Sequence, residues 1–186
     1  MSRSFRETLI TILLAATLFI GLRLTIQTYI VDGPSMEPNY WQNEWIIVNK
    51  LAYKFNSPER GDIIVFQPPI SSTKPFIKRI VGLPGESVEI RNGTVFIHKM
   101  DGNIITLQEP YIKEPYSTSY TSIVIPANEY FVMGDNRNNS TDSRYGWLVS
   151  RDKIHGQAWL SIWPPHLWGT APIYRQSATS SNSAGN

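Results

Sequence analysis

The chain has 186 residues, 41% hydrophobic and 17% charged, which is enough for one domain with a real core and a further segment. It contains no cysteine, so disulfides and thiolate metal sites are excluded. The formal net charge is +2, and after residue 31 basic and acidic residues are equal at 14 each, so we expect no nucleic-acid partner.

The chain begins with a basic start and a long apolar segment. Arg3 and Arg6 stand against Glu7, and residues 9–31 are mostly apolar. As a helix these residues would be about 35 Å long, enough to cross a hydrocarbon core of about 30 Å. Arg23 and Gln27 interrupt the run in its distal half, where a long side chain can reach the interface. We expect a single-pass anchor with residues 1–8 in the cytoplasm, because positive residues favour that side.

A cleavable signal peptide would also show a basic start and a short apolar run. The residues after Gly21 offer no clear small-x-small cleavage site, and a cut shortly after Arg23 would leave Ser35 near a new terminus. The uncleaved anchor is therefore the favoured interpretation.

The next stretch, residues 31–38, reads Val-Asp-Gly-Pro-Ser-Met-Glu-Pro. Proline fixes its own φ and restricts its predecessor, so this backbone is stiff and Ser35 is displayed rather than packed. Such a turn can be a simple connector, or it can present a nucleophile. No G-x-S-x-G elbow is present, and the histidines at 98, 155 and 166 have no recognisable catalytic context, so a nucleophile here needs another base.

Lys78 is the candidate base. It lies in the strand-like apolar run 75–86, which ends in a Gly/Pro turn. Burial disfavours an ammonium and would lower the lysine pKa from about 10.4 towards neutrality, as a general base requires. The alternative is a solvated lysine on an edge strand.

Beyond residue 38 the chain reads as short β-branched and aromatic strands separated by turn signals, with no amphipathic helix of normal length. Asn92-Gly93 and Asp101-Gly102 are strong hairpin signals. We expect a mainly antiparallel β domain over residues 32–175, with a small β insertion at 86–127, and a disordered polar tail at 176–186. The expected strands cover residues 45–48, 62–66, 76–81, 87–90, 94–98, 104–107, 122–125, 130–133 and 157–162.

Residues 134–145 form an Asx-rich loop whose side chains can bond to its own backbone and pair opposite charges. A calcium loop is a further interpretation. The positions of Asp135, Asn136, Asn138 and Asp142 do not follow the D-x-[DN]-x-[DN]-G pattern, so we expect no metal.

Taken together, these stretches resemble the motifs of type I signal peptidases, membrane-anchored Ser/Lys endopeptidases that remove signal peptides from exported proteins. The matching stretches, in the family's order, are residues 35–38, 61–66, 78–85 and 134–145, with a weaker match from 156–158 to 163–164. The resemblance covers nearly the whole chain outside the tail. It implies an antiparallel β catalytic domain behind one transmembrane helix, in a bacterial-type plasma membrane, and no cofactor.

The resemblance also implies residue roles. Ser35 would be the nucleophile and neutral Lys78 its general base, with Ser140 hydrogen-bonded to Lys78. Asp142 would form an ionic network with Arg144 and Arg79, and Asp135 would hold the loop backbone. Where some family members carry a serine as second oxyanion donor this chain has Gly33, which leaves a backbone group for that role.

The substrate would carry small residues at the first and third positions before the cut, because shallow apolar pockets exclude large side chains. The positions that match the family's pocket are Val31, Gly33, Met36, Phe76 and Ile77. Met36 and Phe76 can equally be ordinary core residues. The chain departs from the family at Asn39-Tyr40 and in the order Tyr145-Gly146-Trp147.

The implied partners are preprotein signal peptides and the lipid bilayer, with the secretion translocon as a further candidate. Trp41, Trp45, Trp163 and Trp168 are either core residues or an aromatic edge at the bilayer interface. The alternative function is a catalytically inactive, membrane-tethered β module that binds peptides. Residues 71–74 fit S-x-x-K, but S-D-N and K-T-G are missing, which argues against a penicillin-recognising enzyme.

Overall fold

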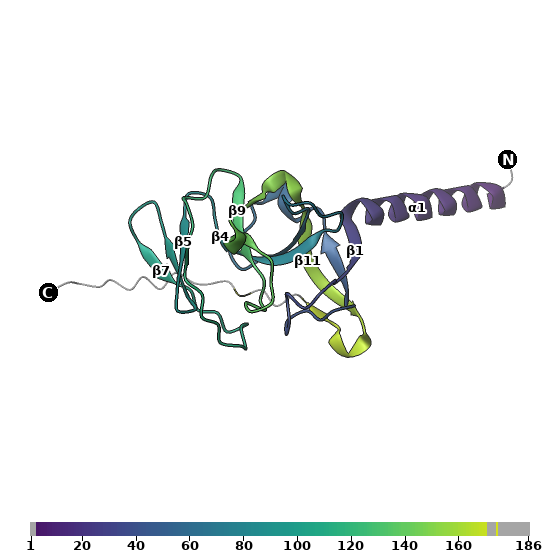
Figure 1. Ribbon diagram of the computed structural model, residues 1–186. Coiled ribbons are helices and arrows are strands. Elements are labelled where there is room, and N and C mark those ends of the chain that lie inside the picture. Colours follow the sequence, from purple (N-terminus) through teal and green to yellow (C-terminus); the bar gives the residue numbers. More distant parts are fainter. Residues whose placement is uncertain (1–2, 171–173, 175–186) are drawn as a thin grey trace.

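A computed structural model describes residues 3–170 and 174, and it consists of an N-terminal helix followed by two antiparallel sheets (Figure 1). The helices are α1 (Arg3–Thr25), α2 (Ala52–Phe55) and the 3-10 turns η1 (Ser143–Tyr145), η2 (Arg151–Lys153) and η3 (Pro165–Leu167). The strands are β1 (Ile26–Ile30), β2 (Trp45–Asn49), β3 (Ile63–Phe66), β4 (Phe76–Gly82), β5 (Ser87–Arg91), β6 (Thr94–His98), β7 (Ile104–Thr106), β8 (Tyr120–Thr121), β9 (Glu129–Met133), β10 (Val149–Ser150), β11 (Ile154–Trp163) and β12 (Gly169–Thr170). The tail expected to be disordered, residues 176–186, lies outside the described residues.

Helix α1 projects away from the β domain, and none of its residues is buried (Figure 1). It is long and apolar enough to cross a membrane. Its position corrects the expected helix over residues 9–31, because it begins at Arg3 and ends at Thr25, and residues 26–30 form β1. The β-branched and aromatic residues of β1 pair in register with β2, from Ile26 opposite Asn49 to Ile30 opposite Trp45. Backbone pairing with β2 therefore ends the helix before the apolar segment ends.

The larger sheet carries the strands that matter for the site. Its eight strands run in the order β1-β2-β11-β3-β4-β9-β10, with β12 paired to β11. The ten-residue strand β11 lies between β2 and β3 in the sheet. Its pairing with each of them has register shifts, which allow the sheet to curl. Strand β4 lies between β3 and β9, with Lys78 opposite Ile64 and Arg79 opposite Met133. Gly134 follows β9 directly, one residue beyond the Arg79–Met133 pair.

The smaller sheet has four strands in the order β7-β6-β5-β8, and Figure 1 shows it at the end of the β domain opposite α1. Its strands lie between residues 87 and 121, in the segment that the sequence predicts as a small β insertion. Asn92 and Gly93 have positive φ in the β5–β6 turn, and Gly102 has positive φ in the β6–β7 turn, as the hairpin signals indicated. Strand β5 follows β4 after a short turn, so the two sheets share the cluster of buried residues around Val81, Val88 and Phe131.

The expected mainly antiparallel β fold is confirmed, and eight of the nine expected strands are present within two to three residues at each end. The strand expected at 122–125 is wrong. The chain pairs with β5 only over Tyr120–Thr121 and then continues without regular structure. The Ser122 hydroxyl accepts a hydrogen bond from the Val88 N–H at 2.7 Å, a position that a backbone carbonyl would hold in a regular ladder.

An exposed apolar row crosses the edge of the larger sheet. Trp45 of β2 lies opposite Ile30 of β1 and opposite Trp163 of β11, and these three side chains are 45%, 57% and 54% exposed, respectively. Trp41, Trp159 and Trp168 are also exposed. The tryptophans singled out in the sequence are thus surface residues rather than core residues, as an interfacial edge requires.

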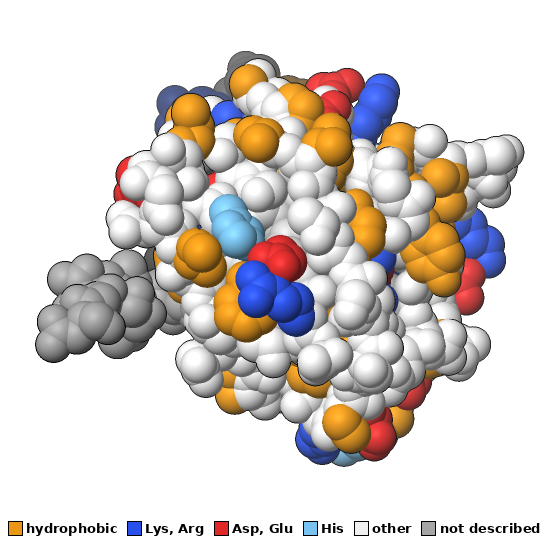
Figure 2. Space-filling view, turned by 60° about the vertical axis from the view of Figure 1, so that its left-hand side comes forward, with side chains coloured by type: hydrophobic (Ala, Val, Ile, Leu, Met, Phe, Trp, Pro, Cys, Tyr) orange, Lys and Arg blue, Asp and Glu red, His pale blue; other side chains and the backbone are white. Residues whose placement is uncertain are grey.

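Charges on the molecular surface are mixed in sign. Figure 2 shows basic side chains next to acidic ones on the face it presents, with hydrophobic side chains in separate groups between polar surface. Ion pairs at the surface include Lys74–Asp32 at 2.5 Å and Arg91–Glu89 at 2.5 Å.

Candidate active site

Ser35 stands in a tight turn directly after the buried residue Val31. The Glu37 N–H donates to the Pro34 carbonyl at 3.1 Å, and the N–H groups of Asn39 and Tyr40 donate to the Met36 carbonyl at 2.9 and 3.0 Å. Gly33 has φ +89°, a conformation that favours glycine. Met36, with no exposed surface, anchors the turn in the core below it. The buried methionine leaves Ser35 on the open side of the turn.

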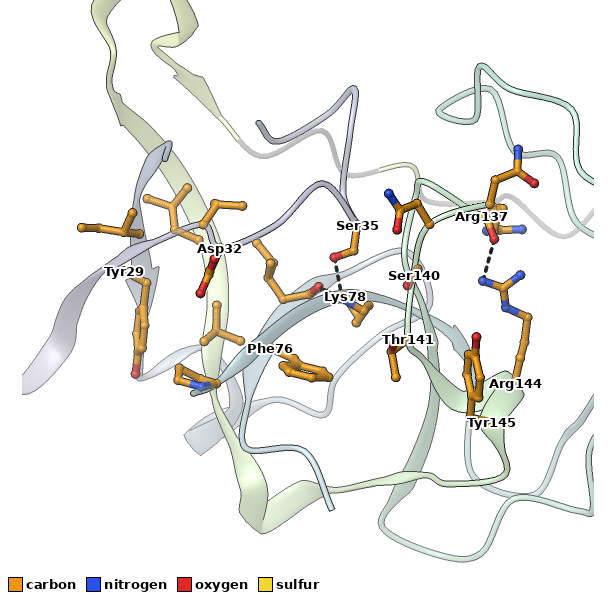
Figure 3. A pocket seen from close by; sticks show the side chains of 18 of the residues that line it. Tyr29, Asp32, Ser35, Phe76, Lys78, Arg137, Ser140, Thr141, Arg144 and Tyr145 are labelled. Atoms are coloured by element: carbon orange, nitrogen blue, oxygen red, sulfur yellow. Dashed lines mark hydrogen bonds between the residues drawn. The ribbon is translucent and has the colours of Figure 1, made fainter. Parts of the chain in front are cut away.

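Lys78 approaches Ser35 from the middle of β4. Its Nζ lies 2.6 Å from Ser35 Oγ and 2.9 Å from the Ile77 carbonyl oxygen (Figure 3). The lysine is only 4% exposed and its Nζ lies 5.2 Å from the centre of the Phe76 ring. The sequence left open a solvated lysine on an edge strand, and that alternative is wrong, because β4 is a central strand of the larger sheet.

Burial lowers the pKa of Lys78 to about 8 from its ordinary value of 10.5. The nearby carboxylates of Asp142 and Asp135 act in the opposite direction and raise it in part. A substantial fraction of the amine is therefore neutral slightly above neutral pH, and a neutral amine next to a hydroxyl can accept its proton.

The loop 134–145 braces the turn that carries Ser35. The Asn136 N–H donates to the Ser35 carbonyl at 3.0 Å, and the Asn136 side chain donates to the Pro34 carbonyl at 3.2 Å. A Cβ on Gly134 would overlap both the Ser35 carbonyl oxygen and Ser140 Oγ. The glycine thus permits a close approach of loop and turn, and the two segments hold each other in place.

Two buried ion pairs support the loop, and they replace the single network that the sequence suggested. Arg144 binds the fully buried Asp142 through Nε at 2.8 Å and Nη2 at 2.9 Å, and Asp142 also accepts from the Gly134 N–H at 3.0 Å. Arg79 binds Asp135 instead, at 2.8 and 2.7 Å. The reason is the register of β4 with β9, which puts Arg79 opposite Met133 and next to the start of the loop.

Asp135 was expected to hold the loop backbone. Its carboxylate instead accepts hydrogen bonds from Arg79 and, at 2.9 Å, from the Asn39 side chain. Arg79 has no exposed surface, donates to the Gly61 carbonyl at 2.9 Å and stacks on Tyr111 with 4.1 Å from its guanidinium carbon to the ring centre. Gly61, in the matched stretch 61–66, therefore helps to hold Arg79 through its carbonyl.

Ser140 lies beside Lys78 without a hydrogen bond to it. Its Oγ is buried and has no hydrogen-bond partner among the described residues, while Lys78 bonds to Ser35 and Ile77. Figure 3 shows Ser140 on the side of Lys78 away from Tyr29. The structure brings the predicted residues into one site but does not form the Ser140–Lys78 hydrogen bond.

A cleft of about 620 Å³ surrounds Ser35 and Lys78 and has two chemically different ends. The end near Tyr29, called the apolar end here, also carries the carboxylate of Asp32 (Figure 3). The apolar residues that line the cleft are Tyr29, Ile30, Val31, Ile46, Val65, Pro75, Phe76 and Ile77. The polar end consists of Thr118, Asn138, Asn139, Thr141 and Arg144. Figure 3 shows Tyr29 at one extreme and Arg144 and Tyr145 at the other, with the Ser35–Lys78 pair between them.

Three of the five residues expected to form the substrate pocket line this cleft: Val31, Phe76 and Ile77. Met36 belongs to the core cluster beneath the turn, and Gly33 shapes the turn. Sequence reasoning missed Asn136, although it lies in a matched motif, and it missed Tyr29, whose hydroxyl lies 2.9 Å from His155 Nδ1. It also missed Thr118, for which the sequence carries no signal. Within the described part of the chain no three His, Asp or Glu side chains are placed to hold a metal ion.

Comparisons with known proteins agree on one family. The family model "Signal peptidase, peptidase S26" matches residues 3–163. A probable signal peptidase I-2 from Synechocystis sp. is 38% identical over 161 residues, 83% of this chain and 71% of the relative. A signal peptidase I from Leptolyngbya laminosa is 38% identical over 167 residues, 86% of this chain and 80% of the relative.

More distant relatives cover similar lengths. Signal peptidase IB from Staphylococcus aureus is 33% identical over 178 residues, 88% of this chain and 92% of the relative. A crystal structure of a signal peptidase I from Enterococcus faecalis V583 aligns with a TM-score of 0.48 at 34% identity, over 55% of this chain and 97% of that one. The family match covers the anchor helix, the Ser35 turn, β4 and the loop 134–145. This chain belongs to the signal peptidase family, peptidase S26.

Proposed function

We propose that this peptidase is a signal peptidase I that removes signal peptides from exported preproteins by a Ser35–Lys78 dyad. The observation that carries the proposal is the 2.6 Å separation of Lys78 Nζ and Ser35 Oγ at the centre of an open cleft. Neutral Lys78 takes the proton of the Ser35 hydroxyl as Oγ attacks the scissile carbonyl. The C–N bond then breaks, the amine leaves with that proton, and water activated by Lys78 hydrolyses the acyl-enzyme.

The tetrahedral intermediate carries an oxyanion that needs hydrogen-bond donors. The backbone N–H of Ser35 is the first candidate, since it belongs to the attacking residue itself. A backbone group would be the second donor, because Gly33 has no side-chain donor. Asn136 supports this arrangement by fixing the Ser35 carbonyl, and with it the peptide planes of the turn.

The substrate would lie along the cleft in one direction. Strand β1 follows directly from α1, so the apolar end of the cleft lies on the part of the chain that leaves the anchor. A signal peptide comes from the membrane, and its last residues would occupy this end, with the residues after the cut at the polar end. Small residues at the first and third positions before the cut fit a shallow site walled by Val31, Phe76 and Ile77.

The proposed topology has one span and an extracytoplasmic peptidase domain in a bacterial-type plasma membrane. It is supported by the length of α1, by its lack of buried residues and by Arg3 and Arg6 at its start. The active site would then stand close to the membrane surface, where signal peptides emerge. Delivery of preproteins by the secretion translocon is part of this proposal.

The test is mass spectrometry of a preprotein with an Ala-x-Ala site after incubation with the wild type and with Ser35→Ala or Lys78→Ala. We expect cleavage after the second Ala by the wild type and a loss of rate of about 10⁴-fold or more in each variant. Lys54→Ala, which changes an exposed lysine in α2, is the matched control and should keep full activity. Full activity of either dyad variant would refute the mechanism.

The alternative is a membrane-tethered module that binds signal peptides without cutting them. The intact Ser35–Lys78 contact argues against it. A folded wild type that binds the preprotein but leaves it uncut would favour this alternative, as would failure of a serine-acylating probe to label Ser35.

A further inference from the structure

Through a buried arginine, the loop 134–145 also contacts the connection between β7 and β8 of the smaller sheet. The Arg137 side chain is 1% exposed, and its guanidinium binds the Glu109 carboxylate with both terminal nitrogens, one of them at 2.9 Å from Oε2. Nη1 also donates to the Tyr116 hydroxyl at 2.6 Å. Glu109, itself 9% exposed at its side chain, accepts a further bond from the Tyr111 hydroxyl at 2.8 Å. A fully buried guanidinium thus depends on groups outside its own loop.

These partners come from residues 107–119, the connection between β7 and β8. The same segment reaches the site by other contacts. The Asn138 side chain donates to the Pro115 carbonyl at 3.2 Å, and Thr118 lines the polar end of the cleft. The Tyr111 carbonyl accepts from Asn39, which follows the Ser35 turn, at 3.0 Å. The segment therefore contacts both parts of the chain that position the dyad.

Within the loop 134–145, Arg137 forms hydrogen bonds with both the first residue, Gly134, and Arg144 near the end. Its Nε donates to the Gly134 carbonyl at 3.1 Å, and its own carbonyl accepts from Arg144 Nη2 at 2.9 Å (Figure 3). Arg144 in turn binds Asp142, one of the carboxylates whose charge raises the pKa of Lys78. A displaced Arg137 would therefore move Ser140, Asp142 and the brace on Ser35 together.

We propose that residues 107–119 are a positioning element of the active site, and that Arg137, held by Glu109 and Tyr116, is the positioning residue through which they fix the catalytic loop. This inference rests on the proposed function, since it concerns the same dyad. The smaller sheet thereby has a role in catalysis, because Glu109 in its β7–β8 connection supplies the counter-charge that keeps the loop 134–145 in its productive geometry. Arg137 acts through Gly134 and Arg144 and touches no reacting atom.

The test uses the double variant Glu109→Met/Arg137→Met in the full-length protein. Replacing both members of a buried ion pair by apolar residues of similar length leaves no unpaired charge, so the fold should persist. We expect kcat on an Ala-x-Ala peptide to fall by about 10- to 100-fold, with KM little changed, because misplacement of catalytic groups by about 1 Å has this effect on rate. The acid limb of the pH–rate profile should also move, since Asp142 shifts relative to Lys78.

Tyr116→Phe provides a second variant that removes one hydrogen bond and no charge, and we expect a smaller fall in kcat in the same direction. Glu114→Gln is the matched control, an exposed acidic residue on the same segment that should keep wild-type kcat. Thermal unfolding of every variant shows which of them are folded.

A folded double variant with wild-type kcat and pH profile would overturn the proposal, since the pair would then serve stability alone. If the double variant does not fold, Tyr116→Phe decides, and unchanged kcat in that variant overturns it. Failure of the proposed function would look different, because the wild type would then leave the peptide uncut or Lys78→Ala would cut it normally.

Discussion

At the scale of single residues, the proposed chemistry depends on an amine in surroundings that disfavour its charged form. Lys78 lies in a central strand, is 4% exposed and has Ser35 as the nearest polar side chain. The two carboxylates that act on it, Asp142 and Asp135, are each bound to an arginine. Burial is the larger influence on the pKa of Lys78, and the two carboxylates oppose it only in part.

The first prediction concerns the pH dependence of cleavage. The pKa of Lys78 is about 8, and only the neutral amine can accept the Ser35 proton. The value of kcat/KM should therefore rise with pH and level off above an apparent pKa of about 8. A pH–rate profile with a soluble peptide measures this limb. An activity that is constant from pH 6 to pH 9 would exclude Lys78 as the base.

The second prediction concerns stability. The pKa of Lys78 is lowered to about 8 in the folded state, so between pH 8 and 10.5 the unfolded state binds more protons and the free energy of unfolding rises with pH. Below pH 8 the buried Lys78 is charged, and it lowers the free energy of unfolding by about 3 kcal/mol relative to its value above pH 10.5.

Lys78→Met removes that penalty and should be more stable than the wild type at pH 7 by up to about 3 kcal/mol. The difference should narrow towards pH 10.5, the ordinary pKa of lysine. Urea unfolding of both proteins across this range measures it. A less stable variant at pH 7 would show that packing or hydrogen bonds of Lys78 outweigh the cost of its burial.

At the scale of elements, the site is assembled from three segments that are far apart in sequence. The Ser35 turn follows β1, Lys78 belongs to β4, and the loop 134–145 follows β9. Strand β4 lies next to β9, and this pairing brings the loop to the lysine. The loop then closes on the turn at Gly134 and Asn136, where backbone meets backbone.

Gly134→Ala tests this close approach. The added Cβ would overlap the Ser35 carbonyl oxygen and Ser140 Oγ, so loop and turn must separate. We expect the free energy of unfolding to fall by about 1–3 kcal/mol, and kcat to fall with it. Gly169→Ala is the control, because a Cβ there meets no atom within 4 Å. Wild-type kcat in Gly134→Ala would mean that the turn does not depend on the loop.

At the scale of the whole molecule, the anchor helix and the β domain are separate in their packing. None of the residues of α1 is buried, whereas β1, which follows it, is an integral strand of the larger sheet. The exposed row of Ile30, Trp45 and Trp163 lies on that same edge, and Ile30 also lines the cleft. Under the proposed function, a substrate that comes from the bilayer would find this apolar row next to the cleft that contains Ser35.

Removal of residues 1–23 should leave the β domain folded, with a change in the free energy of unfolding within about 0.5 kcal/mol, because no buried contact is lost. The fraction of the shortened protein that sediments with lipid vesicles should fall, but some binding should remain through the exposed row of Ile30, Trp45 and Trp163. Trp45→Ser/Trp163→Ser in the shortened chain should abolish the remaining sedimentation. A marked loss of thermal stability on removing α1 would show that the helix packs on the domain.

The sequence by itself predicted the mainly β fold and the apolar N-terminal segment, because these depend on local patterns: strand alternation, turn signals and apolar length. The resemblance of its motifs to a known family predicted the family and the Ser35–Lys78 pair. Only the tertiary structure decided that Arg79 pairs with Asp135, that Met36 is core and that β1 ends the helix at Thr25. It alone joined Glu109 to Arg137, residues 28 positions apart in the sequence. Which charges meet depends on strand register and on the packing of two sheets, and neither is encoded in the spacing of residues along the chain.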